Sequence, residues 1–182
     1  MNATHIVLIT LLIVVTIVVT LYIRKISKLR FFKTRTTEAE KVIEEELKLR
    51  HDLIKETKPF IQKNTKKDID FYDELEKMTS SNINTIELEK ELTKAIVTIN
   101  MITDDYPKLL NKKDYKEILR KLSESTTKLD AAKQFYNNNN NRLSELLKTF
   151  PSNIIGKIKG YEATSNYDAK EIFNAIEEDI RL

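Results

Sequence analysis

The chain has 182 residues, of which 31 are Lys or Arg, 28 are Asp or Glu and none is Cys. The absence of cysteine excludes disulfides and thiolate metal sites, and it fits a reducing compartment. Only 2 glycines and 3 prolines occur, whereas 32% of the residues are charged. A composition so poor in helix breakers, with no alternation of β-branched residues outside one apolar run, predicts an all-α fold.

The apolar run covers residues 6–23 and reads IVLITLLIVVTIVVTLYI, without a charge. As a helix it extends over about 27 Å, close to the roughly 30 Å hydrocarbon core of a bilayer. A cleaved secretory signal is the rival interpretation. It is disfavoured because residues 1–5 carry no Lys or Arg and no small-residue cleavage site follows. Residues 1–23 are therefore predicted to form a single N-terminal transmembrane anchor.

A basic segment, residues 24–35, follows the anchor and contains six Lys or Arg residues. Short flanks rich in Lys and Arg stay on the cytoplasmic side of a membrane. This predicts a cell-membrane protein with its N-terminus outside and residues 24–182 in the cytoplasm. The basic side chains nearest the anchor are expected to contact anionic headgroups: Arg24, Lys25, Lys28 and Arg30.

The rest of the chain is mildly acidic. Six of the 31 basic side chains lie in the first 35 residues, so the remainder carries 25 basic against 28 acidic ones, a net charge of −3. A nucleic-acid partner requires a basic face on the folded domain itself. No nucleic-acid partner is therefore expected.

Three amphipathic stretches follow, and residues 36–161 are expected to form an antiparallel bundle of long helices. In residues 36–61 apolar side chains recur three or four apart, Thr37 is a candidate N-cap, and Pro59 is expected to kink or end the helix near Lys58. That face is expected to contain Ala39, Val42, Ile43, Leu49, Leu53 and Phe60. The second stretch, residues 68–106, is interrupted at residues 79–84, which fit either a bend in one helix or a turn between two.

The third stretch, residues 114–150, has the most regular pattern. Apolar residues recur every seven positions, as expected for a long helix whose seam faces other helices: Tyr115, Leu122, Leu129, Tyr136, Leu143 and Phe150. The pattern keeps its register across the five asparagines 137–141, so these are predicted to be helical and locally weak. Asn140 then lies on or beside the seam.

A short helix is predicted after Pro151, with an apolar face of Ile154, Ile155, Ile158 and Tyr161 and with Gly160 closing its C-terminus. Residues 162–182 form an acidic amphipathic tail. The seam of residues 114–150 must be covered along its whole length, so residues 68–106 are predicted to form one long helix that is bent near residues 79–84. The path then runs away from the membrane, back, and away again. Residues 150–161 are then expected to lie far from the bilayer. A true turn at residues 80–84 would instead bring residues 150–161 back to the bilayer.

The sequence resembles the LemA family of membrane-anchored bacterial helical proteins. The likeness is carried by residues 106–109 (YPKL), 132–137 (AKQFYN) and 147–155 (LKTFPSNII), and by Gly160-Tyr161. The resemblance implies one N-terminal span and a cytoplasmic antiparallel helical bundle. It implies no agreed activity and no catalytic residues.

No enzyme is expected, and no catalytic, cofactor-binding or metal-binding residues are predicted. His51 is the only histidine beyond the anchor, and its neighbour Asp52 is expected to form an ordinary pair with it rather than a catalytic one. The sequence favours a protein-interaction or scaffold module with an unknown protein partner, and self-association stays open. The alternative is lipid-surface sensing or membrane remodelling through the basic segment and the Ile-rich residues 151–161.

Overall fold

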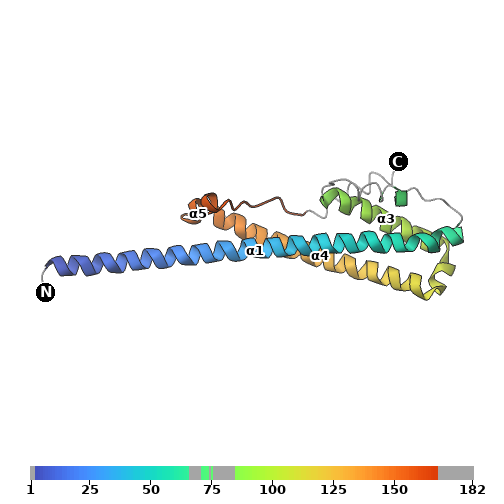
Figure 1. Cartoon of the computed structure of the whole chain (residues 1–182), viewed down its shortest axis with the longest axis horizontal. Helices are drawn as coiled ribbons and strands as arrows, with labels where there is room; N and C mark the ends of the chain where they lie inside the picture. The colour runs from blue at the N-terminus through green and yellow to red at the C-terminus, as the bar shows by residue number, and fades with distance from the viewer. Residues whose placement is uncertain (1–2, 66–70, 74, 76–84, 168–182) are drawn as a thin grey trace. The chain divides into compact units, whose positions relative to one another are not determined.

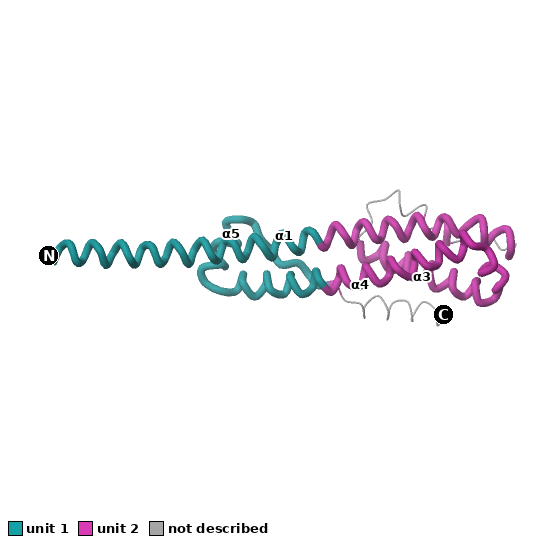
Figure 2. Tube along the Cα trace, turned by 90° about the horizontal axis from the view of Figure 1, so that it is seen from below, with its two compact units in different colours: residues 1–38, 135–166 teal, residues 39–134, 167–182 magenta. Residues whose placement is uncertain are grey.

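The computed structural model describes residues 3–65, 71–73, 75 and 85–167. The described residues form helices and no strand, which confirms the all-α prediction (Figure 1). The elements are α1 (Ala3–Thr65), α3 (Thr85–Asp105), the 3-10 helix η1 (Pro107–Asn111), α4 (Lys113–Leu147) and α5 (Ser152–Lys159). They divide into two compact units, residues 1–38 with 135–166 (unit 1) and residues 39–134 with 167–182 (unit 2) (Figure 2).

The helix α1 is continuous through Thr37, where the sequence predicted the start of a helix, and through Pro59, where it predicted a kink or an end. Thr37 is an interior residue of α1 and not an N-cap, and Pro59 lies inside the helix, which ends at Thr65. A proline in a helix interior removes one hydrogen bond and costs about 3 kcal/mol. Packing offsets that loss here, because Ile61 is completely buried and the Phe60 ring lies 5.7 Å from the ring of Tyr115.

The N-terminal part of α1 is a candidate membrane span. The helix contains an 18-residue window of high mean hydropathy, and none of that window is buried. Every described residue from Ala3 to Arg24 is exposed. In unit 1 this part of α1 extends with no other element beside it (Figure 2). A long apolar surface of this kind is stable in lipid and unfavourable in water.

The predicted seam of α4 is confirmed over five of its six positions. Tyr115, Leu122, Leu129, Tyr136 and Leu143 are all buried. Phe150 is not part of the seam: it lies beyond the end of α4 and is 76% exposed. The asparagines 137–141 are helical, as predicted, because they lie inside α4.

The predicted face of the 36–61 stretch is correct only in part. Ala39, Ile43 and Leu53 are buried and Phe60 is half-buried, but Val42 and Leu49 are exposed. The buried stripe follows a different set of positions: Ala39, Ile43, Leu47, Arg50, Ile54, Thr57 and Ile61. Three of the buried residues missed by the prediction are leucine or isoleucine, and two are polar.

Contacts within each unit set the direction of the helices. In unit 2, Ser125 of α4 contacts the Glu46 carbonyl of α1, and Tyr115 lies beside Phe60, so α4 runs antiparallel to α1. Glu89 pairs with Lys133, and Thr103 pairs with Tyr115, so α4 is antiparallel to α3 as well. In unit 1, Leu143 packs with Leu29, a few residues after the apolar run.

The predicted path of three long helices is therefore wrong. The helix α3 begins only at Thr85 and has the same direction as α1, whereas α4 returns. Residues 150–161 thus lie beside the turns of α1 that follow the apolar run rather than far from them, because Ile155 packs against Leu29 and Leu143. The alternatives for residues 79–84 lie outside the described residues.

Candidate functional site: a basic pocket beside the apolar helix

A pocket in unit 1 lies between the turns of α1 that follow the apolar run and the C-terminal end of α4. Its volume is about 760 Å³. The lining residues are Lys25, Ser27, Lys28, Phe31, Phe32, Arg142, Glu145, Leu146 and Thr149. Because Leu29 of α1 packs with Leu143 of α4 beside it, both walls are held by the same small core.

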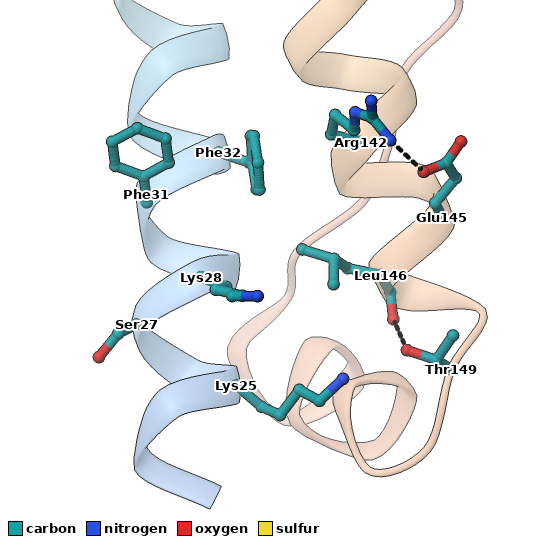
Figure 3. Close-up of a pocket in the computed structure, with 9 residues that line it drawn as sticks. All are labelled: Lys25, Ser27, Lys28, Phe31, Phe32, Arg142, Glu145, Leu146 and Thr149. Carbon is teal, nitrogen blue, oxygen red and sulfur yellow. Dashed lines mark hydrogen bonds and ion pairs between the residues drawn. The ribbon is translucent and has the colours of Figure 1, made fainter. Parts of the chain in front are cut away.

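The pocket carries cationic side chains over an apolar base. Lys25 and Lys28 extend from α1 toward α4, and Phe32 and Leu146 lie between the two helices (Figure 3). Arg142 supplies the cation of the opposite wall and forms a 3.3 Å ion pair with Glu145. Both partners of that pair are about two-thirds exposed, so the pair is weak and the pocket keeps an excess of positive charge.

Only part of the predicted headgroup set reaches this pocket. Lys25 and Lys28 line it, whereas Arg24 and Arg30, both exposed, do not. Arg142 comes from the other end of the sequence and was not predicted. Nothing in the local pattern around Arg142 distinguishes it from other exposed cations, since its role depends on α4 returning to α1.

Aromatic side chains rigidify the wall formed by α1. The rings of Phe31 and Phe32 meet edge to face at 5.3 Å. The Arg35 guanidinium lies 4.8 Å from the Phe31 ring and 5.5 Å from the Phe135 ring of α4. Contacts of this type are worth about 0.5–1 kcal/mol at exposed positions.

The α5 helix packs on the same small core of unit 1 as the two walls of the pocket. Its N-terminus follows Pro151 and its C-terminal cap is Gly160, which has a positive φ of 64°, as the sequence predicted. The expected apolar face is divided, however. Ile155 is buried in the core with Leu29 and Leu143, whereas Ile154 and Ile158 are exposed.

Asn140 uses its amide to fasten the segment after α5. The side chain is buried, and its Nδ2 donates to the Thr164 carbonyl at 2.6 Å and to Asn166 Oδ1 at 2.8 Å. Asn166 in turn donates to Asn141 Oδ1 at 2.8 Å. The asparagine run is thus helical and also hydrogen-bonds to Thr164 and Asn166 in the segment after α5. An apolar residue at position 140 could not form these hydrogen bonds.

The interior of unit 2 contains a buried ionic cluster. Lys133 of α4 pairs with Glu89 of α3, and both side chains are more than nine-tenths buried. Arg50 of α1 is buried close to this pair. Burial lowers the pKa of Arg50, and nearby carboxylates oppose that shift: Glu89, Asp130 and Glu46. Charges from α1, α3 and α4 meet in this core.

Two tyrosine–threonine pairs lie in the same unit. Thr57 contacts Tyr72 at 2.6 Å, and Thr103 contacts Tyr115 at 2.7 Å. Each threonine hydroxyl donates to a carbonyl of its own helix, so the tyrosine hydroxyl is the donor to the threonine oxygen. Burial raises the pKa of Tyr72 to about 12 and also raises the pKa of Tyr115. Both tyrosines therefore remain protonated, donate hydrogen bonds and pack in the interior of the unit.

His51 and Asp52, which are neighbours in the sequence, contact each other. His51 Nδ1 lies 3.2 Å from Asp52 Oδ1, with the ring buried and the carboxylate exposed. Within the described ranges no group of three or more His, Cys, Asp or Glu side chains is arranged to hold a metal ion.

Comparison with protein families gives a match to the LemA family over residues 39–179, which covers most of the chain. The sequence matches no curated protein at a significant level. The matched region begins inside α1 and includes α3, α4 and α5, so it covers the helices that build the folded core. The chain therefore belongs to the LemA family.

Proposed function

We propose that this protein is anchored in the cell membrane by a single span and acts without catalysis as an interaction module for another protein. The observation that supports the proposal most is the continuity of α1 from Ala3 to Thr65. One helix presents an exposed apolar surface at its beginning and the buried stripe of the bundle further on. The same helix therefore contains both the candidate span and a part of the bundle.

The cytoplasm is the proposed location of the bundle. The cationic side chains follow the apolar run directly, and no Asp or Glu occurs in the first 35 residues. Lys and Arg at the end of a span favour the cytoplasmic side. The N-terminus is then outside.

The basic pocket adds a lipid component to this proposal. Its two lysines lie within the first two turns after residue 23, which is headgroup depth for a helix that leaves the bilayer along its normal, and Arg142 faces them from α4. Anionic headgroups are attracted by such clusters at about 1 kcal/mol per Lys or Arg. We infer that Lys25, Lys28 and Arg142 bind the headgroup of an anionic lipid.

The interaction surface is proposed to include the exposed apolar residues of α1 in unit 2. Val42 and Leu49 are seven residues apart and are 42% and 40% exposed. Residues seven apart lie on the same side of a helix. Two large apolar side chains that the bundle leaves in water are suitable contacts for a partner.

Site-specific photocrosslinking in intact cells tests this function. A photoreactive residue at Leu49 is expected to give a discrete protein adduct, whereas one at the exposed Glu44 of the same helix is expected to give little. The adduct should disappear when deletion of residues 6–23 removes the span. Equal crosslinking at both positions, or an adduct that persists after this deletion, would contradict an anchored interaction module.

A further inference from the structure

Large apolar side chains remain exposed around α5 although the helix has already contributed to the core. Phe150, Ile154 and Ile158 are 76%, 49% and 75% exposed, whereas Ile155 between them is 3% exposed. Ile154 and Ile158 are four residues apart and share one helix face, and Phe150 lies in the turn before the helix. We call these three residues the α5 surface. Water is an unfavourable environment for so many apolar groups in nine residues.

The α5 helix is held firmly in its place on α1. Ile155 is buried with Leu29 and Leu143, and Ile26 and Tyr161 pack against the same cluster. Gly156 lies so close to Leu147 that a β-carbon there would overlap the leucine side chain, so the glycine allows close packing. The cap at Gly160 ends the helix at a defined point. The α5 surface therefore keeps a constant height along α1.

That height corresponds to the membrane surface. The apolar run ends at residue 23, and at 1.5 Å per residue Ile26 and Leu29 lie about 4.5 and 9 Å beyond its end. The headgroup region of a bilayer adds about 5–8 Å to each side of the hydrocarbon core. Because α1 is unbroken here, α5 lies at the level of the headgroups when the run spans the membrane.

Basic side chains accompany the α5 surface. Lys148 precedes Phe150, and Lys157 and Lys159 lie in the last turn of α5, all three exposed. Apolar groups beside exposed lysines are typical of helices that lie in the plane of the interface and contact anionic lipid. A helix of eight residues would bind weakly alone, but the span already holds it at the bilayer, so its effective concentration there is high.

We propose that α5 is a second membrane contact, an interfacial helix that inserts Phe150, Ile154 and Ile158 among the headgroups of an anionic phospholipid bilayer. The lysines bind the headgroup phosphates around it. The proposal rests on the membrane span of the proposed function and goes beyond it, because a span alone leaves the bundle free to tilt. With α5 inserted, unit 1 is fixed to the bilayer at two points.

Fluorescence of single labelled cysteines in reconstituted full-length protein tests the insertion. The chain has no native cysteine, so Ile158→Cys, Asn138→Cys and Val14→Cys each give one labelling site. Vesicles contain phosphatidylcholine and phosphatidylglycerol, with nitroxide lipids as quenchers. The dye at Ile158→Cys is expected to emit at a shorter wavelength than in water and to be quenched by the nitroxide lipids, at a shallower depth in the bilayer than the dye at Val14→Cys. The dye at Asn138→Cys, an exposed position of unit 1, is expected to show the emission of a dye in water without quenching.

The outcomes separate this inference from the anchor. Quenching at Val14→Cys together with an aqueous signal at Ile158→Cys would overturn the interfacial helix and leave the span intact. An aqueous signal at Val14→Cys would overturn the span, and the inference with it. An unchanged Ile158→Cys signal in vesicles of phosphatidylcholine alone would overturn the role of the lysines.

Discussion

Replacing Leu129 with alanine is expected to lower the free energy of unfolding by about 2–5 kcal/mol. Leu129 is completely buried in the middle of the α4 seam, with the buried Leu122 and Tyr136 one heptad away on either side. The substitution removes apolar contacts and leaves a cavity that two long neighbouring helices cannot easily close. Chemical denaturation of the full chain in detergent, followed by circular dichroism, measures the loss.

Lys128 provides the matched control. It is the preceding residue, its side chain is 64% exposed, and its ion pair with Glu46 is long, at 3.8 Å. Lys128→Ala is expected to cost less than about 0.5 kcal/mol. Equal losses for the two variants would mean that α4 presents a different face to the bundle.

Replacing Lys133 with methionine is expected to cost about 3–5 kcal/mol, although the new side chain is apolar and similar in length. The substitution removes the partner of Glu89 and leaves a carboxylate that is 4% exposed inside unit 2. A buried charge without its partner is far more costly than an exposed one. The same denaturation experiment measures this loss, and Lys121→Met, at an exposed position of α4, is the control.

A double variant distinguishes loss of the ion pair from loss of packing. Glu89→Leu with Lys133→Met replaces both charges by apolar groups, so the combined loss should be smaller than the sum of the two single losses. Strictly additive losses would show that the Glu89 and Lys133 side chains do not interact in the core.

Features with a local physical signal could be predicted from the sequence. The apolar run of α1 needs no neighbour to be recognised, and the heptad spacing of Leu122, Leu129 and Tyr136 indicates a helix seam even across five asparagines. The cap at Gly160 was likewise predictable, because a left-handed residue at a helix end favours glycine. In each case the residue and its near neighbours carry the whole signal.

The polar residues of the interior could not be predicted in this way. Arg50, Lys133 and Asn140 occupy buried positions, but charged and amide side chains usually indicate an exposed face. Lys133 and Asn140 are buried because partners on another helix or segment satisfy them, Glu89 for Lys133 and Thr164 for Asn140. Spacing within one helix contains no information about such partners.

The basic pocket and the position of α5 were missed for a related reason. Periodicity shows which face of a helix is apolar and not which helix covers it, so the direction of α4 was assigned incorrectly. Once Leu143 and Ile155 pack on Leu29, Arg142 joins Lys25 and Lys28 in one pocket, and Ile158 is left exposed on α5. A contact between residues more than one hundred positions apart determines the site.

The side of the membrane on which each end of α1 lies tests the central claim most directly. Cells producing full-length Ala3→Cys or Glu124→Cys protein are treated with a maleimide that does not cross membranes, before and after permeabilisation. Ala3→Cys is expected to react in intact cells, and Glu124→Cys, exposed on α4, only after permeabilisation, with both proteins retained in the alkali-washed membrane fraction. Reaction of Glu124→Cys in intact cells, or release of the protein by alkali, would contradict a single-span anchor with a cytoplasmic bundle.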